Sequence, residues 1–167
     1  MRKISVAAVL MMLFVLLSGC GEKAEVFTYK GLDGDWSIQI PNTFEKTNEE
    51  KNDQLNMSLT IFQDDQGRMI NIGEILDPTI EVNEEALKEE IALDSYLILE
   101  RTETIDIKGV GTLYGALLED HSTEQFMFYY KLKLEDKVVT FIIQQKKEFT
   151  FEEEAKVKSM MTTLKKL

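Results

Sequence analysis

Apolar and polar residues alternate along much of the first half of the chain, which predicts a series of β-strands. Trp36, Ile38 and Ile40, for example, share one face of a short strand. The expected strands are residues 26–30, 35–40, 54–63 and 68–76. Residues 64–67 (DDQG) predict a tight turn, because aspartate bonds its own backbone and glycine accepts positive φ, so the last two strands form a hairpin. Residues 43–53 are polar and acidic and predict a loop.

The second half of the chain predicts two helices. Residues 84–99 form the first, with Asn83 as its N-cap and with Leu87, Ile91 and Ile98 near one face. A capping box, Thr150-Phe151-Glu152-Glu153, begins the second helix. Its buried face is predicted to carry apolar residues at helical spacing, namely Val157, Met160, Met161 and Leu164.

Four further strands are expected between these helices, at residues 101–107, 112–119, 123–134 and 138–144. The last of them is apolar on both faces apart from Thr140, so we expect it to be central in the sheet and buried on both sides. Strands joined by short turns form antiparallel meanders, and helices segregated from the strands indicate an α+β fold. The predicted fold is therefore an antiparallel meander with helices packed on it, formed by one α+β domain over residues 26–167.

The first twenty residues have a different pattern. Arg2 and Lys3 precede an apolar stretch over residues 4–17, broken only by Ser5, and Cys20 follows as the only cysteine. The apolar stretch is too short to span a bilayer, which takes about 20 residues. The order of basic, apolar and small residues is typical of a secretory signal peptide.

The segment Leu17-Ser18-Gly19-Cys20 resembles the lipobox of bacterial lipoproteins. This resemblance implies that the Cys20 sulfur is diacylglycerylated and that cleavage makes Cys20 the new N-terminus. It divides the chain into a signal peptide (1–19), a lipidated cysteine with a short tether (20–25) and the domain (26–167). The expected location is the extracytoplasmic face of the cell membrane, held by lipid. Lysine is far more frequent than arginine in this chain, which suggests an AT-rich genome. Together with the lipobox, this leads us to expect a Gram-positive bacterium.

The acidic net charge of the chain limits the classes of molecule that it is expected to bind. The formal net charge is −11, and loss of Arg2 and Lys3 with the signal peptide makes it −13. Such a charge argues against nucleic acid as a partner and against adhesion to an anionic membrane surface. Arginine, the preferred clamp for phosphate and carboxylate, occurs only three times, so an anion-binding site is also disfavoured.

Polar residues with possible chemistry are few. His121 lies in an expected turn among carboxylates, but no second histidine is present to complete a zinc site. The pairs Asp33/Asp35 and Asp64/Asp65 are candidates for calcium, although neither matches the EF-hand loop. The sequence has no G-x-S-x-G elbow and no phosphate-binding glycine loop. We therefore expect no catalytic residues, no metal site and no cofactor.

One strand carries the best candidates for contact with another molecule. Phe126, Phe128 and Tyr130 alternate on one face, where they form either core or the lining of an apolar ligand groove. Met127 and Tyr129 lie on the opposite face. If exposed, they would form a partner-binding patch.

The complete pattern resembles the PsbP-like superfamily, which includes the extrinsic photosystem II subunit and the DcrB-like bacterial lipoproteins. The resemblance is carried by the opening strand at residues 34–41, the helix at 83–99, the turn at 107–110 with its following strand, and the closing strand with the 149–153 helix start. It implies an antiparallel sheet with helices on its faces. It also implies a binding or assembly role, because no catalytic motif accompanies the family.

The sequence thus favours a membrane-anchored, non-enzymatic lipoprotein that binds or stabilises a protein partner in the cell envelope. The alternative is a lipoprotein that binds a small ligand or a metal ion in a groove between sheet and helix. A hydrolase is disfavoured by the missing nucleophile and base signals. A filled core with an exposed apolar patch would favour the first hypothesis, and an open apolar pocket with convergent polar groups the second.

Overall fold

A computed structural model describes residues 25–167, which form a mostly β structure with two helices. The strands are β1 (Val26–Lys30), β2 (Trp36–Pro41), β3 (Phe44–Asn52), β4 (Met57–Asp64), β5 (Met69–Ile75), β6 (Leu97–Ile107), β7 (Gly111–Asp120), β8 (Gln125–Lys133), β9 (Val138–Gln145) and β10 (Lys165–Lys166). The helices are α2 (Glu84–Ala92) and α3 (Phe151–Met161). The expected antiparallel sheet with packed helices is confirmed, with strands more dominant than an even α+β mixture. The expected signal peptide and lipobox lie outside the described residues.

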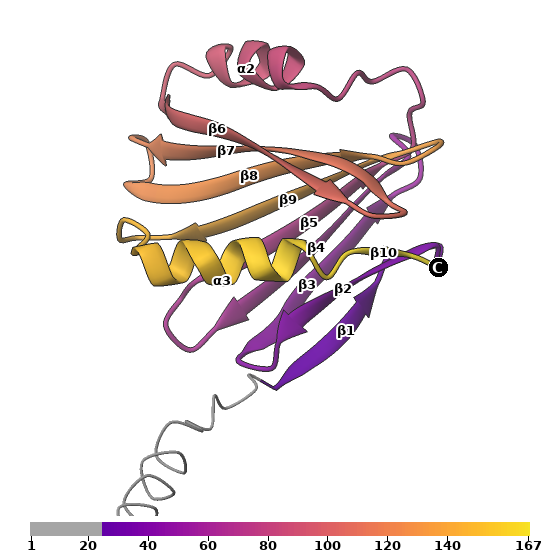
Figure 1. The fold of residues 1–167 in the computed structure, drawn as a ribbon, viewed down its shortest axis with the longest axis horizontal. Coiled ribbons are helices and arrows are strands. Elements are labelled where there is room, and N and C mark those ends of the chain that lie inside the picture. Colours follow the sequence, from indigo (N-terminus) through magenta and orange to yellow (C-terminus); the bar gives the residue numbers. More distant parts are fainter. Residues whose placement is uncertain (1–24) are drawn as a thin grey trace, which may run out of the picture.

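The main sheet has seven strands in the order β3-β4-β5-β9-β8-β7-β6, and every neighbouring pair is antiparallel. It is made of two meanders, β3 to β5 and β6 to β9, which meet where β5 pairs with β9. Strand β9 is therefore in the centre, as its apolar residues predict. The predicted burial on both sides is wrong, because α2 does not cover β9 and Ile142 is only half-buried on that face. The connection through α2 carries the chain from β5 to the far edge of the sheet at β6 (Figure 1).

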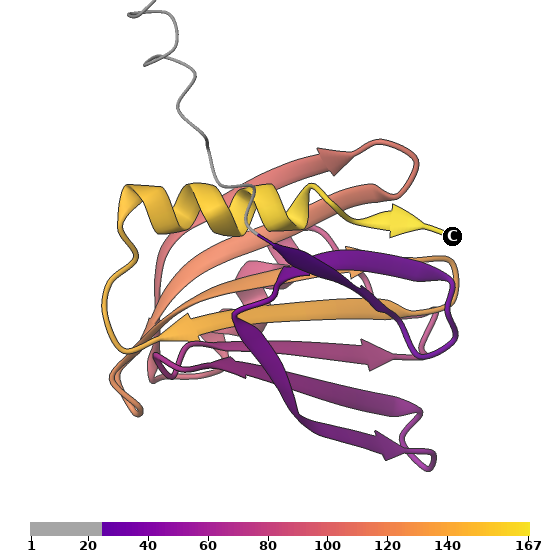
Figure 2. The same ribbon diagram turned by 90° about the horizontal axis from the view of Figure 1, so that it is seen from below.

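One face of the main sheet is covered by α3 and by a small sheet of order β1-β2-β10 (Figure 2). Trp36, Ile38 and Ile40 of β2 are almost completely buried in this layer. The predicted buried face of α3 is confirmed for Val157, Met160 and Met161, whereas Leu164 belongs to the same core but lies beyond the end of the helix. Among residues 25–167, most of the buried apolar side chains lie between these two layers.

Helix α2 covers part of the opposite face, above β6, β7 and β8 (Figure 1). Leu87 and Ile91 point from α2 onto Ala116 and Leu118 of β7, forming a second and smaller core. Asn83 caps the helix as predicted, with its side chain accepting a hydrogen bond from the amide of Ala86 at 2.8 Å. Helix α2 covers only the part of this face formed by β6, β7 and β8.

The predicted helix over residues 84–99 is wrong at its C-terminal end. Helix α2 ends at Ala92, and the chain enters β6 at Leu97. Residues 97–99 pair with residues 118–120 of β7, which satisfies their backbone groups across the sheet. Ile98 matched the helical spacing only by coincidence, and the available strand partner overrode it.

The predicted loop over residues 43–53 is also wrong, because most of it forms β3. Its charged sequence lacks an apolar face, yet it pairs with β4 over its whole length with one register shift between Lys46 and Asn48. As the edge of the sheet, β3 is exposed on most of its side chains, and charged residues with a bulge are typical of edge strands. The short final strand β10 is also absent from the sequence pattern.

Two local predictions are confirmed in detail. The 64–67 turn forms with Gly67 at φ +78°, and the Asp64 carboxylate accepts hydrogen bonds from the amides of Gln66 and Arg68. At the start of α3, the Thr150 side chain accepts from the amide of Glu153, while Glu153 accepts from the amide of Thr150.

Candidate functional site

The two residues proposed for partner contact lie on β8 beneath α2. Met127 and Tyr129 are half-buried and pack against the small core formed by Leu87 and Ile91. The Tyr129 hydroxyl donates a hydrogen bond to Glu90 Oε1 at 2.6 Å. Burial, together with the bond to Glu90, raises the pKa of Tyr129 above its ordinary value. The structure therefore places both residues in the packing of α2 rather than on an open patch.

The aromatic face of β8 belongs to the main core. Phe128 and Tyr130 are fully buried, and Phe126 is packed against the same cluster. The Tyr130 hydroxyl donates a hydrogen bond to Glu103 of β6. Burial is the main cause that raises the pKa of Tyr130, and the contact with Glu103 raises it further. These rings fill the interior, which favours the core interpretation over the groove interpretation.

His121 lies in the turn after β7, with Nε2 3.3 Å from Glu119 Oε1 and about half of its side chain exposed. Asp64 is occupied by the turn and by Arg68, whose Nε donates to it at 2.6 Å. Among residues 25–167, no group of three or more histidine, cysteine, aspartate or glutamate side chains is arranged to hold a metal ion. Neither the turn at His121 nor the 64–67 turn therefore offers positive evidence for a metal site.

Asp33 and Asp35 converge instead on a buried lysine. Lys137, in the β8–β9 connection, is only 1 % exposed. Its Nζ lies 2.9 Å from Asp33 Oδ2, 3.2 Å from Asp35 Oδ2 and 3.5 Å from Glu74 Oε2. Burial alone would lower the pKa of Lys137, but the hydrogen bonds to Asp33 and Asp35 and the charge of Glu74 outweigh it and raise the pKa. The lysine is therefore held in its charged form.

Glu74 extends this cluster into the core. Its carboxylate accepts hydrogen bonds from Trp36 Nε1 at 3.1 Å and from the Leu32 amide at 3.0 Å, as well as facing Lys137. The β1–β2 turn is thus fastened to the ends of β5 and β9 by charge-assisted hydrogen bonds. Sequence reasoning missed Glu74 and Lys137, because each is one charge among many in this acidic chain.

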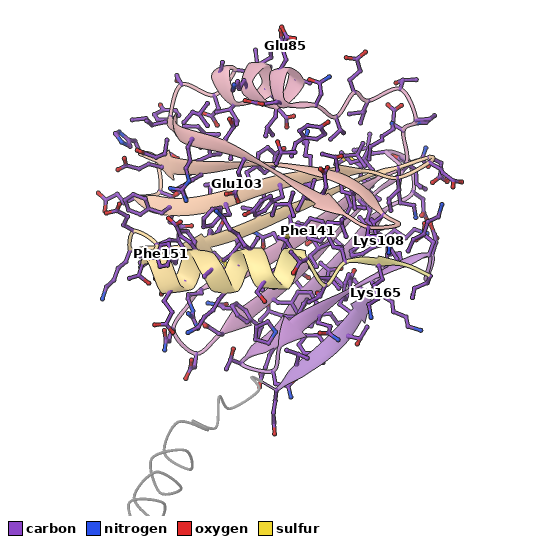
Figure 3. All side chains as sticks on the ribbon, viewed as in Figure 1. Glu85, Glu103, Lys108, Phe141, Phe151 and Lys165 are labelled. Carbon is purple, nitrogen blue, oxygen red and sulfur yellow. The ribbon has the colours of Figure 1, made fainter. Side chains whose placement is uncertain are left out.

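Two hollows lie next to the β1–β2 turn. The first, of about 120 Å³, lies between Leu32 and Asp33 of the turn, Lys51 and Asp53 of the β3–β4 hairpin, and Leu76 after β5. The second, of about 300 Å³, is lined by Asp35, Leu134, Glu135, Asp136 and Lys166. Both lie at the end of the sheet where β3, β5 and β8 finish, the end at which Figure 3 labels Lys108 and Lys165.

Four large apolar side chains are exposed beside the first hollow. Leu32, Met57 and Leu76 are about 40 % exposed, and Leu55 at the tip of the β3–β4 hairpin is 62 % exposed. We call these four residues, with Asp33, Lys51 and Asp53 at their border, the turn-end surface. It combines apolar area with mainly negative charge, so it is suited to a partner that presents apolar and basic side chains.

Comparisons with known proteins find similarity in fold and none in sequence. No family model matches the chain, and no curated protein matches it in sequence. Solved structures do match it in three dimensions. One is the solution structure of cyanobacterial PsbP (CyanoP) from Synechocystis sp. PCC 6803, with a TM-score of 0.56 and 13 % identity over 91 % of this chain and 99 % of that chain.

A second similar structure is the Ran-binding protein Mog1p of Saccharomyces cerevisiae, with a TM-score of 0.55 and 12 % identity over 85 % of this chain and 95 % of that chain. A mutant form of Mog1 gives a TM-score of 0.53 at 12 % identity, over 84 % of this chain and 95 % of that chain. The chain has a PsbP- and Mog1-like fold. The PsbP-like part of the predicted resemblance is therefore confirmed at the level of fold.

Proposed function

We propose that this protein is an extracytoplasmic lipoprotein, anchored by acylated Cys20, that binds or stabilises a protein partner in the cell envelope without catalysing a reaction. The anchor rests on the Leu17–Cys20 lipobox and the signal peptide pattern before it. Two acyl chains give stable membrane attachment, whereas one gives only reversible binding. Within residues 25–167, neither helix is long and apolar enough to cross a bilayer.

The observation that carries the binding proposal is the turn-end surface. Exposed leucine and methionine side chains are clustered there beside carboxylates, and one of them, Leu32, is on the turn that the buried Lys137 cluster fixes. Fixed apolar side chains bind with little loss of conformational entropy, which favours a specific contact. The Mog1p structure is that of a Ran-binding protein, so partner binding is compatible with this fold.

The alternative, a lipoprotein for a small ligand or a metal ion, has less support. The hollow at the turn-end surface is about 120 Å³, whereas ligand pockets usually hold about 300–1,000 Å³. The larger hollow reaches the lower end of that range, but it is lined by three carboxylates and one lysine with only one apolar side chain. A small cation is the ligand that such a lining would favour.

The proposed function is tested by chemical crosslinking in intact cells followed by capture of the full chain. We expect one reproducible envelope protein with the wild type, and much less of it with Cys20→Ser, which lacks the anchor. Leu55→Asp should also reduce capture, because it places a charge in the turn-end surface. Leu93→Asp is the matched control, since Leu93 is 89 % exposed after α2, away from that surface.

The outcomes separate the hypotheses. Equal capture by the wild type and Leu55→Asp would refute the role of the turn-end surface. The absence of any specific protein would refute partner binding and direct attention to a small molecule that co-purifies with the chain.

A further inference from the structure

On the face of the main sheet that carries α2, the surface over β4, β5 and β9 is left uncovered by the helix and has an unusual composition. We call the side chains of this surface the floor. Directly opposed residues of antiparallel strands share a face, so the registers of β4, β5 and β9 define which side chains lie there. Twelve positions make up this face, four from each strand. None of the twelve is charged, and seven are aliphatic or methionine. In a chain with 29 % charged residues, a solvated sheet face would be expected to carry charge.

Eleven of these twelve floor residues are partly exposed, the exception being Val138 at 1 %. Leu59, Ile61 and Ile142 are half-buried, whereas Ala116 and Leu118, on the same face beneath α2, are 0 % and 1 % exposed. The difference is the covering helix, because α2 is the only helix that the described residues provide on this side of the sheet (Figure 1). The uncovered floor also continues into the turn-end surface through Met57, which faces Ile75 in the sheet.

The dimensions of the floor fit one α-helix. Strands lie about 4.8 Å apart, so three strands make a track about 14 Å wide, and a helix with its side chains is about 10–12 Å across. Four alternate positions along a strand extend about 20 Å, the length of a helix of about 14 residues. Helix α2 already occupies the neighbouring track on the same face, which shows that this sheet accepts a helix there.

The β3 margin of the uncovered track is acidic. On the α2 side, Glu90 reaches Tyr129 and Lys131 of β8, whereas Glu84 accepts a hydrogen bond from Thr102 of β6, at the far edge of the sheet. On the other side, β3 directs Glu45 and Glu50 to this face, opposite Gln63 and Leu59, with no lysine among its residues on that face. An occupant with basic residues beside its apolar stripe, on the edge that faces β3, would complement this margin and the floor together.

Two lysines of β8 lie on the same face between the track and α2, and both are already engaged. Lys131 forms an ion pair with Glu90 of α2. Lys133 Nζ donates to the backbone carbonyls of Asp77, Pro78 and Ile80, in the connection that leads to α2. The charged side chains at this margin are therefore already paired or hydrogen-bonded, and the acidic side chains beside the track are those of β3.

We propose that the uncovered track over β4, β5 and β9 binds an amphipathic helix of a protein partner, with an apolar stripe against the sheet and lysine or arginine on the flank that faces β3. This inference rests on the proposed partner-binding function and names the chemistry of the partner. A second copy of the chain is disfavoured as occupant, because two acidic-rimmed faces repel each other. An anionic bilayer is disfavoured for the same reason.

The test uses the full chain in zwitterionic phosphatidylcholine nanodiscs and two labelled synthetic helices of about 18 residues, slightly longer than the track. Both peptides carry the same leucine stripe; one has lysine on its flanks and the other glutamate. We expect fluorescence anisotropy to show at least about tenfold tighter binding of the lysine-flanked peptide, with empty nanodiscs as reference. Added salt should weaken that binding.

Two variants localise the contact. Leu59→Lys combined with Ile61→Lys places two cations on the floor and should weaken binding of the lysine-flanked peptide by at least about tenfold. Thr104→Lys is the control, because it lies in the same row of the sheet as Leu59 but at the far edge, on β6. It should change the affinity by less than about twofold.

Several results would overturn the inference: equal binding of both peptides, no binding of either, or unchanged binding by the double variant. If circular dichroism shows that the double variant is unfolded, a photo-crosslinker on the leucine stripe replaces it. Crosslinks to β4, β5 or β9 support the inference, and crosslinks confined to other elements refute it. A cellular partner that still binds a folded double variant would refute this inference while leaving the proposed function intact.

Discussion

At the residue scale, the tightest constraints surround Trp36. Its side chain is 0 % exposed, its indole donates to Glu74, and its ring contacts Tyr29 and Phe141 edge-on. Gly31 permits this packing, since a Cβ at that position would lie 2.1 Å from the indole nitrogen. The sequence identified Trp36 as a core residue of β2, but only the structure shows that the same side chain holds Glu74 in place.

We expect Trp36→Ala to lower the free energy of unfolding by about 3–5 kcal/mol, because it leaves a large cavity and removes a hydrogen bond from Glu74. Urea denaturation measures the change. Trp36→Phe is the control, since it retains much of the apolar volume and should lose less. An unchanged unfolding midpoint for Trp36→Ala would show that the core around β2 is wrongly described.

Asp33 should make stability depend on acidic pH. Its hydrogen bond from Lys137 lowers its pKa below the ordinary value of 3.8. A lowered pKa in the folded state stabilises the protein above 3.8, and this stabilisation disappears as the pH falls through the lowered pKa. The wild type should therefore melt at a higher temperature than Asp33→Asn at pH 7, and the difference should shrink in strong acid.

Thermal melts from neutral pH down to about pH 2 test this expectation. Asp65→Asn, which removes one exposed carboxylate at the opposite end of the sheet, controls for the change in net charge. A difference between wild type and Asp33→Asn that stays constant across the whole range would contradict the ion pair with Lys137.

At the scale of elements, different interactions set the ends and the position of the two described helices. Helix α3 begins at a reciprocal capping box and is held to β6 by ion pairs from Arg101 to Glu154 and from Lys158 to Glu103. Helix α2 has an N-cap at Asn83 but stops after nine residues, because the following chain is drawn into β6. Capping residues therefore located both helix starts, whereas the end of α2 depended on a strand partner distant in sequence.

Thr150→Ala should destabilise the protein by about 1 kcal/mol, because the amide of Glu153 loses its acceptor at the start of α3. Chemical denaturation measures this change. The double variant Thr150→Ala/Glu153→Ala should lose less than the sum of the single variants, since the two side chains bond reciprocally. Strict additivity would show that the capping box does not act as one unit.

At the scale of the whole molecule, the main sheet separates two unequal faces. One is covered by α3 and the small β1-β2-β10 sheet, and the other is covered by α2 over only part of its width (Figures 1 and 2). The described residues begin with β1, on the face covered by α3 and the small sheet. We therefore expect the proposed anchor at Cys20 and the proposed partner track to lie on opposite faces of the sheet.

The whole-molecule prediction concerns this anchor. Cys20→Ser should abolish acylation, because the hydroxyl cannot replace the thiol that forms the thioether, and should yield an unprocessed or soluble chain. Membrane fractionation with metabolic labelling by a fatty acid measures the effect. Ser18→Ala, which keeps a small residue in the lipobox, should remain anchored. A Cys20→Ser chain that stays firmly lipid-linked would exclude the lipobox interpretation.

The sequence alone determined those features whose causes are local. Alternation set most strands, Asp64 to Gly67 set a turn through backbone hydrogen bonding and positive φ, and Thr150 set a helix start. The central position of β9 also followed from its own apolar composition, but burial on both faces did not, because Ile142 is only half-buried on the face that α2 leaves uncovered.

Only the tertiary structure decided features that require distant residues to meet. Strand β3 exists because β4 supplies hydrogen-bond partners to a segment without an apolar face, and β6 begins early because β7 is available. The cluster of Lys137 with Asp33, Asp35 and Glu74 joins residues up to 104 positions apart, so no sequence spacing reveals it. The uncovered track likewise depends on where α2 lies, because the same alternating pattern describes a strand whether or not a helix covers it.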